Sequence, residues 1–188
     1  MSRIALTGGI ACGKSLVARR LNELGIETID ADDVVHELMP DAAERRRIAA
    51  AVFADPEKRR ALEARLHPLV KARINEFLTF KSNNQTIKQS NNQSIRIAVI
   101  PLLFETHWDA EYDIICCVRS TRAVQVARMV ETRGYTREEA EARLAAQLPV
   151  EEKAAKSHYV IDNDGTVADL MAHVREFAAW LRAGTKGK

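Results

Sequence analysis

The segment TGGIACGKSL, Thr7 to Leu16, has Gly8, four further residues, and then Gly13, Lys14 and Ser15. Glycines allow a tight turn whose backbone N–H groups point at phosphate oxygens. The lysine can reach the β- and γ-phosphates of a nucleotide, and the serine hydroxyl can coordinate magnesium. The apolar run RIAL precedes the segment and a helical pattern follows it, as such a loop requires. These residues predict a phosphate-binding loop (P-loop) that holds a nucleotide with Mg²⁺.

The predicted nucleotide contacts of the P-loop are Gly9, Ala11, Cys12, Gly13, Lys14, Ser15 and Leu16. Cys12 also raises a separate hypothesis. A thiol at a helix N-terminus tends to have a lowered pKa, so that its oxidation could block ATP binding. The alternative is that Cys12 is a passive small residue.

Three carboxylates follow the second predicted strand, in the stretch IDADDVV. Asp30 and Asp32 stand at alternate positions at the carboxyl end of that strand, where open parallel sheets bind their ligands. Two carboxylates there can serve a magnesium shell and an acceptor hydroxyl. The alternative is that Asp30 or Asp32 only caps the following helix, a common use of aspartate. Asp33 makes a third acid, which is more than a cap requires.

Short β-branched runs alternate with longer helical patterns along the chain, and this alternation predicts an α/β fold with a parallel five-stranded sheet flanked by helices. The strand runs are RIAL, IETID, IRIAVI, YDIICCV and YVID. Gly25 is the expected C-terminal cap of the helix that begins at Lys14. Pro56 marks a further helix start, and HPLV, residues 67–70, is expected to interrupt or bend that helix.

The composition limits the class of protein. The 188 residues are 46% hydrophobic, with a formal net charge of only +2, and they suit one domain without the charge of a nucleic-acid-binding protein. Three cysteines, at 12, 116 and 117, are too few and too poorly spaced for a disulfide framework or zinc site. No leader or membrane-spanning run is apparent, so we expect a cytoplasmic protein with no membrane partner.

An imperfect tandem octapeptide, SNNQTIKQ followed by SNNQSIRI, occupies residues 82–97. It is polar and cannot bury much apolar surface, so residues 81–94 are predicted to form a flexible polar insert. A partner-binding role for the insert is the alternative.

The P-loop alone does not separate GTPases, motor ATPases and small-molecule kinases. The chain has no Asn-Lys-x-Asp run to read guanine and no long second half to couple hydrolysis to motion. Several motifs, in order, resemble the dephospho-coenzyme A kinase family. They are IALTGGIACGKS, LGIETIDADDVVHEL, VFADPEKRRALEARLHPLV, IPLLFE, YDIICCV and TREEAEARLAAQLPVEEKAAKSHYVIDNDGT.

This resemblance covers nearly the whole chain. It implies one P-loop kinase domain, residues 1–188, with a helical substrate-binding region at 33–80 and a helical lid at 133–150. It also implies transfer of the ATP γ-phosphate to the ribose 3′-hydroxyl of dephospho-coenzyme A, the last step of coenzyme A biosynthesis. Monomer or weak homo-oligomer is expected.

The resemblance also assigns roles to single residues. Asp32 is implied as the base or orienter of the acceptor hydroxyl, with Lys14 and Arg143 as the other catalytic residues. Asp30 joins Ser15 in the magnesium shell, and Asn163 lies in the loop around adenine. In IPLLFE, residues 100–105, Leu102, Leu103 and Glu105 are either near the acceptor or ordinary core and surface residues.

Two departures from the family pattern concern the acceptor side. The segment MPDAAERRRIAAA, residues 39–51, is shorter than the family's counterpart, and the polar insert precedes the IPLLFE strand. In the P-loop, Ala11 and Cys12 replace the more usual glycine and serine. Two alternatives therefore stay open. One is a kinase for another small molecule or nucleotide, and the other is an ATP-binding protein with impaired transfer activity.

Overall fold

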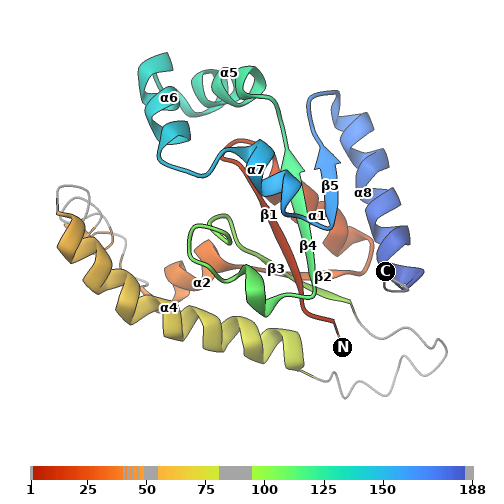
Figure 1. Ribbon diagram of the computed structural model, residues 1–188, viewed down its shortest axis with the longest axis horizontal. Coiled ribbons are helices and arrows are strands. Elements are labelled where there is room, and N and C mark those ends of the chain that lie inside the picture. Colours follow the sequence, from red (N-terminus) through yellow and green to blue (C-terminus); the bar gives the residue numbers. More distant parts are fainter. Residues whose placement is uncertain are drawn as a thin grey trace. The chain divides into compact units, whose positions relative to one another are not determined.

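The computed structural model describes residues 2–39, 41, 43, 45, 47–48, 55–80 and 95–184 (Figure 1). The predicted insert at 81–94 lies outside these described residues. The chain divides into two compact units, one of Met1–Thr28 with Asn91–Lys188 and the other of Ile29–Ser90. The first unit carries the P-loop and most of the sheet, and the second, which we call the helical unit, is helical over most of its described residues.

Five strands form one sheet in the order β2-β3-β1-β4-β5. They are β1 (Ile4–Gly8), β2 (Glu27–Asp30), β3 (Arg96–Val99), β4 (Ile114–Arg119) and β5 (Tyr159–Asp162). β1 runs parallel to β3 and β4, with Leu6 opposite both Val99 and Cys116, and β4 runs parallel to β5. β1 and β3 are buried along their whole length, which explains the apolar runs at residues 4–6 and 97–99. The predicted five-stranded parallel sheet is confirmed.

Helices cover the sheet and extend beyond one end of it. In the first unit they are α1 (Lys14–Glu23), α5 (Arg122–Arg133), α6 (Arg137–Ala145), α7 (Val150–Ala155) and α8 (Val167–Arg182), with a short 3-10 turn at Asp109–Glu111. α7 packs on β1 and β4, while α1 and α8 pack on each other. Figure 1 shows α5 and α6 together beyond the carboxyl end of β4. The region predicted as a lid, residues 133–150, begins at the last residue of α5 and contains α6.

Local sequence signals set the ends of these helices. Gly25 has a φ of 78° just after α1, where the N–H groups of Gly25 and Ile26 bond the carbonyls of Asn22 and Leu21. This is the expected glycine cap. At the start of α6, the Thr136 hydroxyl accepts the Glu139 N–H and the Glu139 carboxylate accepts the Thr136 N–H, which together form a capping box.

The helical unit contains α2 (Ala31–Leu38) and α4 (Pro56–Thr79), which pack on each other. Asp55 caps α4 and Pro56 occupies its first turn, as predicted. The expectation that HPLV could interrupt this helix is wrong, because α4 runs through Pro68 without a break. Proline removes the hydrogen bond to the carbonyl four residues earlier, that of Ala64. Ala64 is exposed, so water can satisfy that carbonyl.

Candidate active site

The P-loop joins the end of β1 to the start of α1, which is the strand, loop and helix context that the sequence predicts. Its backbone turns through the left-handed region at Ala11, with φ 58°, and at Gly13, with φ 93°. Alternation between right- and left-handed residues gathers successive N–H groups on one concave side, a geometry that binds anions. Ala11 adopts this conformation although it carries a Cβ, at a position where glycine would be unstrained.

Every carbonyl of the P-loop from Gly8 to Cys12 accepts a hydrogen bond from a side chain. The donors are Lys14 Nζ for Gly8 (3.0 Å) and Gly9 (2.8 Å), Gln125 Nε2 for Ile10 (2.7 Å), Arg128 Nη1 for Ala11 (3.3 Å) and Asn163 Nδ2 for Cys12 (2.9 Å). Only the lysine belongs to the loop motif. The other donors come from α5 and from the residue after β5, and we call Gln125, Arg128 and Asn163 the supporting donors.

The backbone N–H groups of the P-loop are arranged in the opposite way. Cys12 N–H bonds the Gly9 carbonyl at 3.3 Å. Among the residues that the structure describes, the N–H groups of Ile10, Ala11, Gly13 and Ser15 have no acceptor. The loop therefore has its acceptors occupied and its donors available, as a phosphate-binding site requires.

Two supporting donors also explain the loop glycines. A Cβ at Gly9 would lie 2.4 Å from Gln125 Nε2, and a Cβ at Gly13 would lie 2.4 Å from Asn163 Nδ2. Real Cβ atoms do not approach other atoms so closely, so any side chain at either position would displace the amide. The glycines make room for protein groups behind the loop as well as for a ligand in front of it.

The structure contradicts the hypothesis that Cys12 is an oxidation-sensitive thiol. Its side chain is fully buried, and burial raises the pKa of the Cys12 thiol against the opposing effect of Lys14. A raised pKa leaves the thiol protonated and unreactive at neutral pH. Cys12 is therefore the passive buried residue of the alternative interpretation.

The predicted acidic residues lie at the start of the helical unit. Asp30 caps α2, because its Oδ1 accepts the backbone N–H of Asp32 at 2.9 Å. The capping role that the sequence left open is thus present. Asp32, in the first turn of α2, is exposed to solvent and so is Asp33. The roles of Asp30 toward magnesium and of Asp32 toward the acceptor hydroxyl stay predictions.

The predicted lid arginine lies on α6. The guanidinium carbon of Arg143 is 4.4 Å from the centre of the Tyr135 ring, a cation–π contact, and its side chain is exposed. Arg128, on α5, bridges the carbonyls of Ala11 and Asn163. No local sequence pattern predicts this bridge, because its partners are far apart in the chain.

Sequence reasoning also missed a buried ion pair. Lys153, on α7, is fully buried, and its Nζ lies 2.7 Å from Glu105 Oε1 and donates to the Pro101 carbonyl at 2.9 Å. The same carboxylate oxygen accepts the Leu148 N–H at 3.1 Å. Glu105, predicted near an acceptor, thus joins the loop after β3 to the segment that follows α6. Leu103 is fully buried and Leu102 is 42% exposed.

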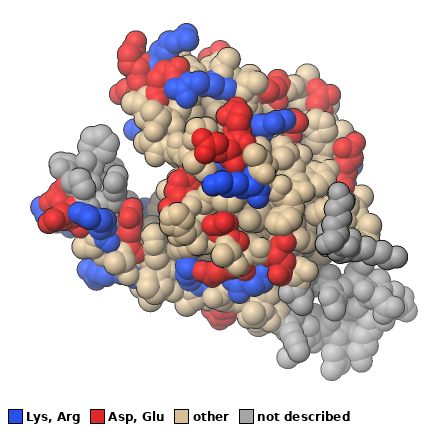
Figure 2. Space-filling view, in the orientation of Figure 1, with Lys and Arg blue, Asp and Glu red and all other residues tan. Residues whose placement is uncertain are grey.

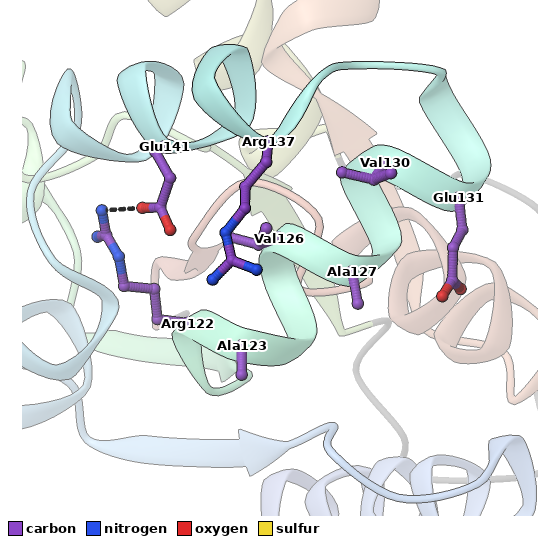
Figure 3. A pocket seen from close by; sticks show the side chains of 8 residues that line it. All are labelled: Arg122, Ala123, Val126, Ala127, Val130, Glu131, Arg137 and Glu141. Atoms are coloured by element: carbon purple, nitrogen blue, oxygen red, sulfur yellow. Dashed lines mark hydrogen bonds and ion pairs between the residues drawn. The ribbon is translucent and has the colours of Figure 1, made fainter.

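Each unit has a groove on its surface. Figure 3 shows the first, of about 510 Å³, between α5 and α6. Small and apolar side chains of α5 form its floor, and the ion pair of Arg122 with Glu141 crosses its rim. None of the predicted site residues lines it. The second, of about 470 Å³, belongs to the helical unit, and most of its lining residues are apolar, Leu38 and Leu69 among them, together with Arg65.

The surface carries both signs of charge. On the face shown in Figure 2, Lys and Arg side chains alternate with Asp and Glu and do not gather into one basic area. Over the described ranges, no helix combines the length and the apolar character needed to cross a membrane.

The donor chemistry of the P-loop fits magnesium. Mg²⁺ prefers hard oxygen ligands and keeps several waters beside nucleotide phosphates, so that a protein supplies only one or two ligands. The exposed hydroxyl of Ser15 and the carboxylate of Asp30 are ligands of this kind. Within the described part of the chain, no three or more His, Cys, Asp or Glu side chains are grouped so that they could hold a metal ion.

Comparison with known proteins identifies the family. A family model described as dephospho-CoA kinase matches residues 2–45 and 39–169. The chain belongs to the dephospho-CoA kinase family. The two stretches matched by the dephospho-CoA kinase model overlap at residues 39–45, inside the segment that the sequence suggests is shortened.

Individual relatives support membership of the dephospho-CoA kinase family. The dephospho-CoA kinase of Symbiobacterium thermophilum is 37% identical over 97% of this chain and 82% of its own length. That of Geobacter metallireducens is 40% identical over 87% of this chain and 88% of its own length. This family membership makes the protein a kinase, and hence an ATP-dependent phosphotransferase.

Solved structures agree on the fold. A crystal structure of a Thermus thermophilus protein is 31% identical, with a TM-score of 0.76, and the match covers 96% of this chain and 97% of that one. A dephospho-CoA kinase from Campylobacter jejuni has a TM-score of 0.68 at 24% identity, covering 97% and 98% of the two chains. A shikimate kinase from Acinetobacter baumannii, at 16% identity, covers 100% and 96% with a TM-score of 0.65. At these lower identities the likeness shows the P-loop kinase fold alone.

Proposed function

We propose that the protein transfers the γ-phosphoryl group of ATP to the ribose 3′-hydroxyl of dephospho-coenzyme A. The proposal rests on the family match across most of the chain, together with a P-loop whose carbonyls are occupied and whose N–H groups are available. In the transfer, the 3′-oxygen forms a bond to the γ-phosphorus while the bond to the β,γ-bridging oxygen breaks, and ADP leaves.

We assign Asp32 to the acceptor hydroxyl, whose proton its carboxylate receives. In a loose phosphoryl-transfer transition state this proton leaves late, so the position of the carboxylate matters more than its base strength. Exposure of Asp32 suits this role, because an ionised carboxylate needs no burial to orient a hydroxyl.

We assign Lys14 and Arg143 to the phosphates. Lys14 Nζ already lies at the mouth of the P-loop on the Gly8 and Gly9 carbonyls, and it contacts phosphate oxygens when a nucleotide is bound. Arg143 is carried by α6 and reaches the transferred group as the lid closes. Ser15 and Asp30 would hold Mg²⁺, which neutralises charge on the β- and γ-phosphates when bound.

The apolar groove of the helical unit supports an acceptor with an apolar arm. Leu38 and Leu69 are 39% and 52% exposed, which is high for large aliphatic side chains. The pantetheine arm of dephospho-coenzyme A offers apolar surface to cover them, and Arg65 can face a phosphate.

The decisive experiment measures ADP release from magnesium-ATP with and without dephospho-coenzyme A. We expect turnover that requires the acceptor. An Asp32→Asn variant should lower kcat about 10²-fold or more while ATP binding stays within about twofold, because the carboxylate acts on the acceptor side. The matched control is Asp33→Asn, which changes an adjacent exposed carboxylate and should leave kcat within about twofold.

The same assay separates the alternatives. Turnover with another hydroxyl acceptor, such as shikimate or a nucleoside, would indicate a different small-molecule kinase. ATP binding with no acceptor-dependent turnover would indicate a nucleotide-binding protein without transfer activity.

We further propose that the protein acts in the cytoplasm, as a monomer or weak homo-oligomer. The three cysteines are buried and unbonded, as in a reducing compartment. Light scattering on the purified chain measures the oligomeric state.

A further inference from the structure

The P-loop of this chain receives hydrogen bonds from groups that its own motif does not contain. Gln125 and Arg128 both lie on α5, three residues apart on one face of the helix. Asn163 follows β5. From the geometry we infer that Gln125, Arg128 and Asn163 are positioning residues for nucleotide binding, which hold the P-loop carbonyls outward so that its N–H groups face the phosphates.

The first argument is burial. Gln125 is 3% exposed and Asn163 is 6% exposed, so neither side-chain amide can replace its hydrogen bond to the loop by one to bulk water. An amide buried without a partner is costly, and each of these two amides has a loop carbonyl as its partner. The loop and the amides therefore fix each other.

The second argument is that the supporting donors form one network. Arg128 Nη2 and Ser120 Oγ both donate to the Asn163 carbonyl, at 2.7 Å and 2.8 Å, and Arg128 Nη1 also donates to Ser120 Oγ at 3.1 Å. Ser120 is fully buried. The network holds α5 and the residue after β5 at fixed positions behind the loop, so that its members act together.

The third argument is the fit of the glycines. Gln125 Nε2 and Asn163 Nδ2 occupy the space that a Cβ at Gly9 or Gly13 would need. The amides lie directly on the loop backbone, without an intervening layer. The side chain of Asn163 thus contacts the loop backbone, and its predicted place in the loop around adenine stays a prediction.

Because α5 leads directly into α6, the network also links the P-loop to the helix that carries Arg143. A nucleotide bound at the P-loop is therefore connected, through Gln125 and Arg128, to the helix that precedes the predicted lid. This inference deepens the proposed function and rests on nucleotide binding by the P-loop.

The test measures binding of ADP and of AMP, which differ by the phosphate that the loop is expected to hold. Gln125→Met removes the donor at similar size, and Asn163→Asp replaces the donor by an acceptor of the same shape. We expect each variant to weaken ADP binding about tenfold or more and to change AMP binding by less than about twofold. Glu131→Gln, an exposed change on α5, is the matched control and should alter neither affinity.

Arg128→Lys provides a second measurement that does not depend on the folding of the amide variants. Lysine keeps the charge but cannot span the Ala11 and Asn163 carbonyls as the guanidinium does. We expect a selective loss of ADP affinity of several-fold, with an unchanged melting temperature.

The outcomes distinguish the two proposals. If the unaltered chain binds no ADP, the proposed function fails. If the unaltered chain binds ADP and Arg128→Lys and the folded amide variants retain its affinity, or lose AMP and ADP affinity equally, the inference is overturned.

Discussion

The P-loop and the helical unit hold their predicted site residues in different ways. In the P-loop, each carbonyl from Gly8 to Cys12 accepts a hydrogen bond from a side chain. In the helical unit, Asp32 is exposed on α2, which packs on α4. Val34 of α2 and Val70 and Ile74 of α4 are buried. We expect the P-loop, which buried side chains hold in place, to keep its conformation before a ligand binds. We expect exposed side chains such as Asp32 to reach their functional positions only when a ligand is bound. We therefore expect changes in the first region to alter binding or stability, and exposed catalytic groups to alter rate.

The largest effect is expected for the exposed guanidinium on α6. Arg143→Ala should lower kcat about 10³-fold, because the arginine stabilises charge that exists only in the transition state. Affinity for ATP should stay within about twofold. Steady-state kinetics and direct ATP titration measure the two quantities. Arg137→Ala on the same helix is the control, and a comparable loss of kcat in that variant would contradict the assignment of Arg143.

The buried ion pair gives the next effect. Lys153→Met leaves Glu105 without its partner, and we expect the free energy of unfolding to fall by about 3–5 kcal/mol. The matched change in the helical unit is Arg73→Met, which breaks an exposed pair with Glu37 and should cost less than about 1 kcal/mol. Urea denaturation compares the two. Equal losses would remove the contrast between the regions.

Part of this contrast could be predicted from the sequence and part could not. The P-loop, the Gly25 cap and the Thr136 capping box are local patterns, in which the partners lie within a few residues of one another. Gln125 bonds a carbonyl 115 residues away and Asn163 one 151 residues away, and no local pattern encodes such pairs.

The two wrong expectations have a similar cause. The sequence shows Pro68 as a helix breaker but does not show that the affected carbonyl would be exposed. It places Cys12 at a helix N-terminus but does not show that the thiol would be fully buried. Burial depends on the whole fold, so the local sequence alone led to wrong predictions for both residues.

Alkaline pH should weaken the first unit selectively, because all three cysteines belong to it. Burial raises the pKa of Cys12 and Cys116 above the ordinary value and that of Cys117 to about 12. The unfolded chain ionises its thiols near pH 8.5, roughly, whereas the native chain keeps them protonated. Above about pH 8.5 the native chain therefore binds more protons than the unfolded chain, so that the free energy of unfolding falls as pH rises. Below about pH 8.5 this contribution to stability is fully present.

We expect Cys117 to contribute a loss of about 2 kcal/mol by pH 10 or so. Urea denaturation between neutral pH and that limit measures the slope, and Cys117→Ala should flatten it. A slope that Cys117→Ala leaves unchanged would show that the thiol is not responsible.

The smallest effect concerns the one non-glycine P-loop residue with a positive φ. Ala11→Gly should relieve left-handed strain at φ 58° and stabilise the protein by about 0.5–1 kcal/mol. In the helical unit, Ala61→Gly is an exposed helix substitution and should destabilise by about 1 kcal/mol. Thermal unfolding of the two variants should shift in opposite directions, and a destabilised Ala11→Gly protein would contradict the assigned strain.

The close approach of Gln125 to Gly9 and of Asn163 to Gly13 has a consequence for how this chain can evolve. A mutation at either glycine is harmful while the facing amide keeps its length, and a shortened amide alone leaves a loop carbonyl unbonded. Each pair must therefore change together or not at all. This epistasis couples the P-loop motif to residues more than a hundred positions later in the chain. A P-loop grafted into another kinase without these residues would keep its sequence but lose the backbone conformation that they support.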